Sequence, residues 1–191
     1  MRPDNLSWEK ALDRLKAGNQ NFKTDKLDGN LQNSSRREEL VGGQHPFAII
    51  LSCADSRVVP ELAFDTGMGE VFVIRVAGNT ANASSIASIE YAVAHLGVNL
   101  IIVLGHESCG AVTAAIAGGD NGYNLNHLLS HITPAVAASE DPSVNAVVKK
   151  NAELTTKALS ERSAIIRDAL DNGLKILPAY YHLGSGEVEY L

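Results

Sequence analysis

The sequence predicts an α/β fold with a central, mostly parallel β-sheet flanked by helices, preceded by an N-terminal helical arm. Three short apolar runs rich in Val and Ile, at residues 47–53, 71–77 and 99–106, alternate with helix-like stretches. Such near-continuous apolarity is typical of strands that are buried on both faces of a parallel sheet. Strands that alternate with helices indicate β-α-β units with right-handed crossovers.

The N-terminal segment predicts one amphipathic helix and a polar connection. Trp8, Ala11, Leu12 and Leu15 recur at helical spacing behind Ser7, which is a favourable N-cap residue. Residues 24–46 are polar and contain Gly, with a short helical piece around residues 35–41. We interpret residues 1–46 as an arm that leads to the core, and residues 47–191 as the α/β core of a single domain spanning 1–191.

Further helices and a final strand pair complete the predicted core. The clearest helical stretch covers residues 84–97 and ends at Gly97, as helices often do. A long helical region is expected over about residues 125–172. Residues 175–183 and 187–191 then predict a last pair of strands, turned by the Gly-Ser-Gly sequence at 184–186.

Composition narrows the class of protein. A chain of 191 residues, 45% hydrophobic and 20% charged, suits one globular domain with a sizeable core. The net charge of -6 argues against a nucleic-acid partner, which favours a basic face. The sequence contains no run of about 18 apolar residues, so it indicates no membrane span. The N-terminus lacks the apolar segment of a signal peptide, which favours the cytoplasm, or the periplasm if a leader has been removed.

Two predicted strand ends carry unusual polar residues. The stretch LSCADSRVVPE (51–61) places Cys53, Asp55 and Arg57 at every second position, so that they point to one side if the chain is still extended. The stretch GHESCG (105–110) places a histidine and a cysteine three residues apart at a strand-to-helix junction. Functional residues of such sheets gather beyond the carboxyl ends of the strands.

These residues predict a zinc site. If the first and third strands are neighbours, Cys53 joins His106 and Cys109 in a Cys2His set, which suits zinc. Three protein ligands leave an open position, where the pKa of a bound water falls to about 7. Asp55 is placed to accept a hydrogen bond from that water, and Arg57 keeps the carboxylate ionised. Alternatively, Asp55 fills the fourth position and closes the site.

The two motifs together resemble those of the β-class carbonic anhydrases, C-x-D-x-R and H-x-x-C. Other stretches resemble this family in their usual order, so the likeness spans nearly the whole chain: ALDRLKAGNQNF, FVIRVAGNTAN, IEYAVAHLGV and YYHLGSGEVEYL. The resemblance implies a zinc lyase with one Zn²⁺ per chain, which hydrates carbon dioxide reversibly to bicarbonate and a proton by zinc-bound hydroxide. It also implies a homodimer or a dimer of dimers, because the pocket of the family lies at a subunit interface.

The resemblance assigns roles to individual residues. It implies Cys53, His106 and Cys109 as the zinc ligands, Asp55 and Arg57 as the catalytic dyad, and Gln44, Phe72, Tyr91 and Gly110 as substrate-binding residues. Ile50 stands where self-regulating members carry a tryptophan, which implies a site that is open near neutral pH. Ala77 stands where several relatives carry valine, which would widen the pocket. His95, four residues after Tyr91 on the same helical face, is a candidate proton shuttle.

Other interpretations of these residues remain open. The same fold and metal would serve a hydrolase of a CO2 analogue such as COS or CS2. A non-catalytic zinc-binding or redox-sensing protein is a further alternative, but it leaves Asp55 and Arg57 without a role. Taken singly, the cysteines could be core thiols, the Asp55–Arg57 pair an ordinary surface ion pair, and His95 a histidine with no function.

Overall fold

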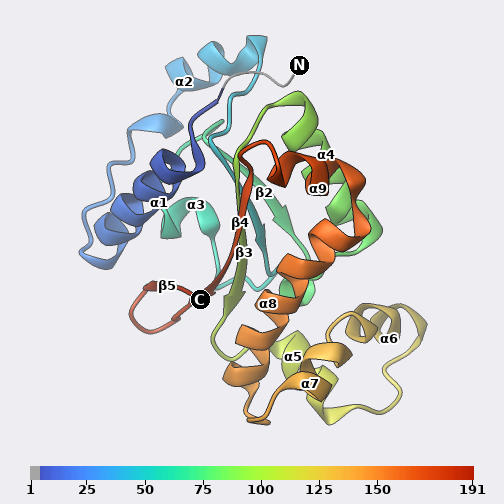
Figure 1. Ribbon diagram of the computed structural model, residues 1–191. Coiled ribbons are helices and arrows are strands. Elements are labelled where there is room, and N and C mark those ends of the chain that lie inside the picture. The colour runs from blue at the N-terminus through green and yellow to red at the C-terminus, as the bar shows by residue number, and fades with distance from the viewer. Residues whose placement is uncertain (1–4) are drawn as a thin grey trace.

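The computed structural model describes residues 5–191, which form a five-stranded sheet with helices on both faces (Figure 1). The strands are β1 (Ala48–Ser52), β2 (Val71–Arg75), β3 (Leu100–His106), β4 (Lys175–Tyr181) and β5 (Val188–Tyr190). Their order across the sheet is β2-β1-β3-β4-β5; the first four are parallel and β5 is antiparallel to β4. The predicted fold class and the final strand pair are thereby confirmed.

Helices connect these strands and cover the sheet. The α-helices are α1 (Trp8–Lys23), α2 (Ser34–Glu39), α3 (Pro60–Ala63), α4 (Ala83–His95), α5 (Gly110–Ala117), α6 (Tyr123–Ser130), α7 (Thr133–Ala138), α8 (Val144–Arg162) and α9 (Ala164–Leu170). Short 3₁₀ helices, η1 (Asn30–Gln32), η2 (Leu40–Gly42) and η3 (Ala77–Asn79), lie in the connections. Within residues 5–191, none of the helices combines the length and apolarity needed to cross a bilayer.

Local sequence explains where several helices begin. The Ser7 hydroxyl accepts a hydrogen bond from the backbone N–H of Lys10 and caps α1, as predicted. The predicted helical region at 125–172 is divided into α6, α7, α8 and α9. Pro134 lies in the first turn of α7, while Ser143 and Ser163 cap α8 and α9, so each of these residues starts a new helix.

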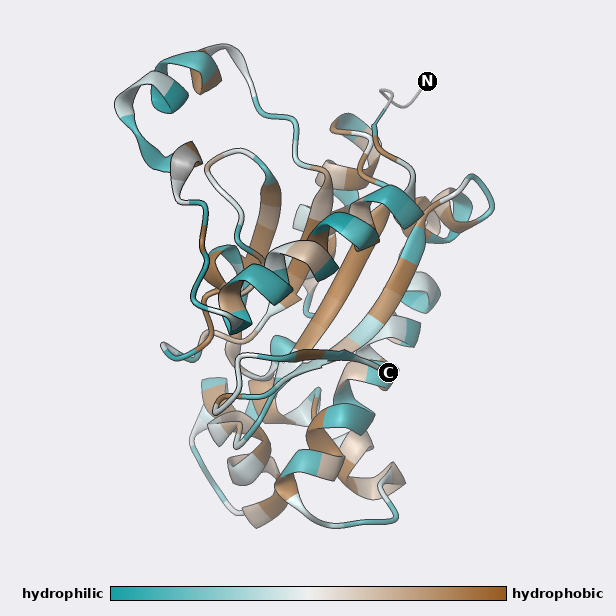
Figure 2. Cartoon of the chain, turned by 90° about the vertical axis from the view of Figure 1, so that its left-hand side faces the viewer, coloured by the Kyte–Doolittle hydropathy of each residue, from teal (hydrophilic) through white to brown (hydrophobic). Residues whose placement is uncertain are grey.

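Alternate residues of the central strands pack against different layers of helices. Ile49 and Leu51 of β1 face a core that includes residues of α4, α8 and α9. Ala48 and Ile50 face the opposite core, which α1 and α3 cover. Figure 2 shows the strands as a hydrophobic layer between helices whose outer surfaces are hydrophilic. This arrangement explains the near-continuous apolar runs, because both sides of β1 and β3 are buried.

The edge strand β2 departs from this pattern. We predicted burial on both faces for all three apolar runs, and for β2 this is wrong: four of its residues are half-buried, and the fifth, Arg75, is exposed. Its position explains the difference, since β2 is paired with β1 on one side only. Arg75 can therefore reach around the end of β1.

A third, smaller core lies beyond the carboxyl ends of β1 and β3. It contains Cys53 and Cys109 together with Val147 and Val148 of α8 and residues of α5 and α7. The two strand ends predicted to carry functional residues therefore meet in one buried region, backed by α8 (Figure 1).

Candidate active site

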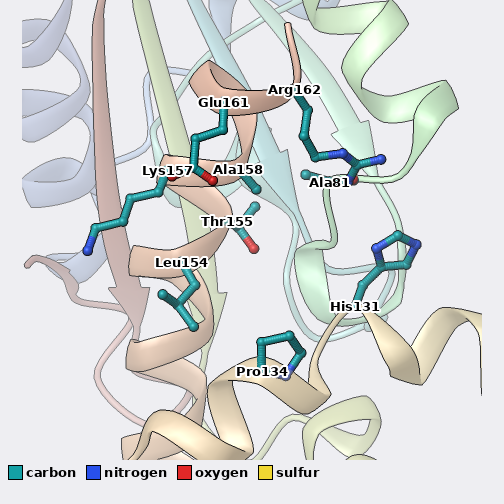
Figure 3. A pocket seen from close by; sticks show the side chains of 9 residues that line it. All are labelled: Ala81, His131, Pro134, Leu154, Thr155, Lys157, Ala158, Glu161 and Arg162. Atoms are coloured by element: carbon teal, nitrogen blue, oxygen red, sulfur yellow. The ribbon is translucent and has the colours of Figure 1, made fainter.

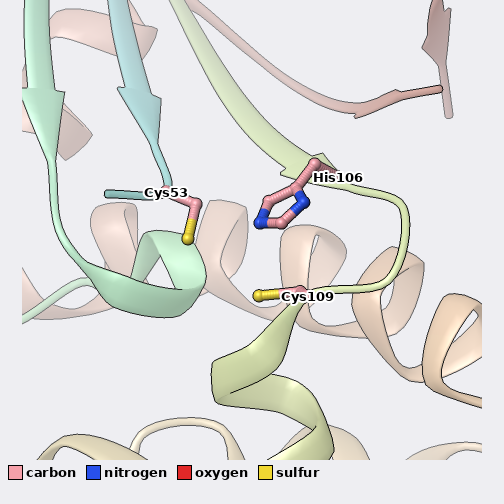
Figure 4. A group of neighbouring side chains, drawn as sticks. All are labelled: Cys53, His106 and Cys109. Carbon is pink, nitrogen blue, oxygen red and sulfur yellow. The ribbon is translucent and has the colours of Figure 1, made fainter. Parts of the chain in front are cut away.

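Two cysteines and one histidine converge where the central strands end. Cys53 follows β1, His106 is the last residue of β3, and Cys109 precedes α5. Because β1 and β3 are paired in parallel, these residues meet: one ligand atom from each lies within 4.8 Å of the other two. Figure 4 shows both sulfur atoms and the imidazole ring directed toward one another. Their exposed fractions are only 4%, 0% and 1%.

The donor set fits a zinc ion. The Nδ1 of His106 lies 2.9 Å from the carbonyl oxygen of Glu107, which as acceptor places the proton on Nδ1 and leaves Nε2 with a lone pair. That Nε2 is buried and has no hydrogen-bond partner among the described residues. Both cysteines are free thiols. A buried imidazole nitrogen without a partner, beside two free thiols, is the arrangement that a thiophilic metal satisfies.

Electrostatics favour ionisation of the first thiol. The Cys109 thiol donates to Cys53, and this outweighs burial and lowers the pKa of Cys53 to about 4. The backbone N–H of Gly78 also donates to the Cys53 sulfur, at 3.3 Å. The same sulfur–sulfur hydrogen bond raises the pKa of Cys109, so the metal-free pair holds one proton. A bound cation takes the place of that proton and stabilises the second thiolate.

The Asp55–Arg57 pair lies beside this cluster, in a turn. Strand β1 ends at Ser52, and Val58 donates to the Asp55 carbonyl, so the condition of a chain still extended through Arg57 is not met. The turn instead folds the guanidinium back onto the carboxylate. Nε of Arg57 donates to Oδ1 of Asp55 at 3.0 Å, and Nη2 donates to Oδ2 at 2.8 Å.

This pairing keeps Asp55 ionised. The hydrogen bonds from Arg57 hold the pKa of the carboxyl far below its usual range and outweigh the opposing effect of burial. Oδ2 of Asp55 lies 3.9 Å from Nε2 of His106, at the edge of the candidate metal site. Both carboxylate oxygens are engaged by Arg57, so the side chain is turned toward the guanidinium.

The sequence interpretation missed two residues that hold this region. Arg75, at the end of β2, donates from Nε to the Cys53 carbonyl at 3.0 Å and from Nη2 to the Asp55 carbonyl at 2.6 Å. Gly78 supplies the N–H that contacts the Cys53 sulfur. Both lie in FVIRVAGNTAN, a stretch whose likeness to the family was noted without a role for either residue. An arginine directly at a strand end was the available signal.

Gly110 lies next to the cluster as the first residue of α5. A Cβ atom at this position would meet no atom within 4 Å, so open space adjoins its backbone. Amide N–H groups in the first turn of a helix have no partner within that helix and favour negative charge.

The remaining predicted residues lie near the amino-terminal ends of β1 and the edge strand β2, or on α4. Phe72 is level with Ile49 in the β1–β2 register, four residues before Cys53, or about 13 Å at strand spacing. Its ring centroid lies 6.4 Å from that of Tyr91, which lies 5.1 Å from that of His95. Gln44 is exposed and precedes β1. The chain therefore does not bring these four residues to its own cysteine–histidine cluster.

A separate cavity of about 250 Å³ lies between the end of α8, the start of α7 and Ala81 (Figure 3). His131, Thr155 and Arg162 contribute polar groups to its walls, and Leu154 and Pro134 contribute apolar ones. None of the predicted site residues lines this cavity, so it is distinct from the cluster.

Comparisons with known proteins agree with this geometry. Residues 48–188 match the family model described as carbonic anhydrase. The chain is 37% identical over 184 residues to carbonic anhydrase 2 of Mycobacterium tuberculosis, covering 92% of this chain and 89% of that protein. Among solved structures, a tetrameric β-carbonic anhydrase from Sordaria macrospora superposes with a TM-score of 0.76 at 26% identity, covering 95% of this chain and 97% of the other.

A second structure, a Coccomyxa β-carbonic anhydrase in complex with acetazolamide, has a TM-score of 0.73 at 27% identity and covers 96% of this chain and 82% of the other. The family model covers most of the chain, and the relatives in sequence and in structure carry the same name. With its mostly parallel sheet and its Cys2His cluster at the strand ends, the chain belongs to the β-carbonic anhydrase family.

Proposed function

We propose that the chain catalyses the reversible hydration of carbon dioxide to bicarbonate and a proton, at a zinc ion held by Cys53, His106 and Cys109. The observation that carries this proposal is the buried, unpartnered Nε2 of His106 between two free thiols and beside an ionised carboxylate. Zinc in such a set acts as a Lewis acid that makes a nucleophilic oxygen available from water near neutral pH.

Residues around the zinc site orient the nucleophile and stabilise the developing charge. Asp55 is a fixed, negatively charged acceptor that orients the nucleophile by accepting a hydrogen bond from it. Arg57 prevents the carboxylate from turning away or becoming protonated. The amide of Gly110, at the start of α5, donates to a developing bicarbonate oxygen. Burial of the cluster excludes bulk water and so strengthens these interactions.

We further propose that a second copy of the chain completes the substrate pocket. Gln44 precedes β1, and Phe72 lies near the amino-terminal end of the edge strand β2 with Tyr91 beside it, whereas the cluster of their own chain follows the carboxyl ends of β1 and β3. A twofold arrangement that sets this edge of one subunit against the cluster of another supplies the glutamine and an apolar wall. The tetrameric state of the Sordaria relative supports a homodimer or a dimer of dimers.

The position of His95 supports its proposed part in proton transfer. It is exposed and lies against Tyr91, which is 49% exposed itself. In a dimer of the kind proposed, the two side chains would lie near the partner's cluster. An exposed imidazole can pass protons to buffer near neutral pH.

The geometry also supports a site that stays open. Ile50 is fully buried in the core under α1 and α3, and Asp55 is held by two hydrogen bonds from Arg57. We therefore expect the fourth zinc position to remain available at neutral pH. A steep collapse of activity below about pH 8, with Asp55 bound to zinc in a crystal structure, would contradict this expectation.

The test is a stopped-flow CO2 hydration assay with zinc content measured on the same sample. We expect about one zinc per chain. The Cys53→Ser variant should lose the metal, whereas Asp55→Ala should retain it and lose most of the rate. COS and CS2, assayed in parallel, decide between CO2 and its analogues. Full activity in metal-free protein would refute the proposal, and a zinc protein inactive on all three substrates would favour a non-catalytic role.

A further inference from the structure

Helix α8 contacts two segments at the candidate zinc site: the loop between His106 and Cys109, and the 3₁₀ helix η3, which lies beside Cys53. It packs against β3, β4 and η3, and Val147 and Val148 belong to the same buried cluster as Cys53 and Cys109. Two of its asparagines form hydrogen bonds to these segments: Asn145 to the His106–Cys109 loop and Asn151 to η3. With Val148 between them at intervals of three residues, they lie along one broad side of the helix.

Asn151 holds the loop beside Cys53. Its side chain is 1% exposed, and Nδ2 donates to the carbonyl oxygen of Gly78 at 2.9 Å. The N–H of that same Gly78 donates to the Cys53 sulfur at 3.3 Å. Gly78 has φ +67°, and a Cβ there would lie 2.6 Å from Ile132, so the backbone is closely confined. Asn151 therefore holds the residue whose N–H contacts the sulfur.

Asn145 holds the loop between the other two ligands. Its Oδ1 accepts a hydrogen bond from the N–H of Ser108 at 3.0 Å. Ser108, between His106 and Cys109, has φ +54°, a conformation that residues with a side chain rarely adopt. Nη2 of Arg57 lies 3.4 Å from the Ser108 carbonyl. Both backbone polar groups of Ser108, the N–H and the C=O, therefore have a hydrogen-bond partner. A strained conformation persists only where surrounding contacts fix it in this way.

We propose that Asn145 and Asn151 are positioning residues of the metal centre. From a single helix, Asn151 holds Gly78, whose N–H contacts the Cys53 sulfur, and Asn145 holds the loop between His106 and Cys109. Together they keep the three ligands at the separation that zinc requires. This inference rests on the zinc site proposed above. Groups that orient metal ligands from outside commonly change metal affinity about 10–100-fold when removed, so both residues should matter without touching metal or substrate.

The experiment compares Asn151→Leu and Asn145→Ala with wild type as purified holoenzymes. Zinc affinity is measured by competition with a chelator, and the cobalt-substituted enzymes report the thiolate-to-metal charge-transfer bands. We expect zinc affinity to fall about 10–100-fold in each variant, and the bands of Asn151→Leu to shift because the Cys53 sulfur loses an oriented donor. Affinity and bands equal to those of wild type in both variants would overturn the inference.

The matched control is Asn19→Leu. Asn19 is likewise buried, at 6% exposed, and donates to the carbonyls of Ala63 and Gly186, which lie outside the loops that hold the cluster. It should lose thermal stability but keep wild-type zinc affinity and cobalt bands. An equal loss of affinity in this control would mean that general destabilisation explains the effect, and would overturn the inference.

A rescue variant keeps the test decisive if Asn151→Leu fails to fold. Glycine adopts positive φ without a steric penalty, so Ser108→Gly combined with Asn145→Ala should recover most of the affinity lost by Asn145→Ala alone. No recovery would count against the proposed role of Asn145. Wild-type protein that binds zinc tightly but does not hydrate CO2 would refute the proposed function while leaving this inference testable by metal affinity.

Discussion

Gly105 lies where β3 meets α8, one residue before His106, and substitution by alanine should disturb this contact. A Cβ at position 105 would lie 2.7 Å from Cγ1 of Val148 and 3.4 Å from the Val148 carbonyl oxygen. To restore ordinary contact, one partner must move by about 0.7 Å. Valine is stiff at χ1 and its methyl group cannot simply rotate away, so the helix itself must shift.

The expected cost can be worked out from these distances. Overpacking of a filled core typically costs about 1–3 kcal/mol. Alanine gains about 0.5–1 kcal/mol over glycine inside a strand, which leaves a net loss of about 0–2.5 kcal/mol for Gly105→Ala. Val148→Ala removes two buried methyl groups at about 0.8 kcal/mol each. In the double variant Gly105→Ala/Val148→Ala, the new methyl group fills part of the space that the valine vacates. The double variant should therefore lose about 1 kcal/mol less unfolding free energy than the two single variants lose together.

The assay is urea unfolding of the zinc-loaded protein at one fixed protein concentration, which keeps any contribution of assembly constant. Gly184→Ala serves as the control, because a Cβ there would meet nothing within 4 Å. A loss of unfolding free energy in the double variant that equals the sum of the two single losses to within about 0.5 kcal/mol would refute the reasoning. Additivity would mean that α8 does not pack against position 105.

Three further predictions concern the site and its surroundings. Arg75→Gln removes the donors to the Cys53 and Asp55 carbonyls, and should keep zinc but lower kcat/KM for CO2 by about tenfold or more; a rate that falls only in proportion to zinc content would contradict this. The hydrogen bond from Lys149 lowers the pKa of Glu189, so this carboxylate stabilises the fold above its unfolded pKa of about 4.3 and loses that effect as the pH falls through the folded value. The urea midpoint of Glu189→Gln should therefore lie below that of the wild type at pH 7, and the two midpoints should converge below about pH 4. A difference between the midpoints that does not change with pH would exclude the ion pair as its cause. Removal of zinc with a chelator should lower Tm by about 10 °C, because free zinc at 1,000 times its Kd contributes about 4 kcal/mol; calorimetry with and without chelator measures this, and an unchanged Tm would argue against a metal that binds the folded state.

Much of the fold was predictable because local patterns and burial agree. The runs that became β1 and β3 are apolar at every position, and the structure buries both faces of each strand. The start of α1 and the β4–β5 pair likewise follow from a cap residue and a glycine turn. The half-exposed β2 was missed because an apolar run does not reveal whether a strand has one neighbour or two.

By itself, the sequence determined which chemical groups the centre contains: two thiols, an imidazole, a carboxylate and a guanidinium, in two motifs at predicted strand ends. Only the tertiary structure decided how they meet. The pairing of β1 with β3 brings the thiols and the imidazole together, and a turn, not an extended strand, brings Arg57 to Asp55. Tertiary structure also separated Phe72 and Tyr91 from the cluster and placed Asn145 and Asn151 behind it. Apart from the local Asp55–Arg57 pair, these contacts join residues tens of positions apart, and their geometry depends on strand order and helix packing, which short-range sequence patterns do not encode.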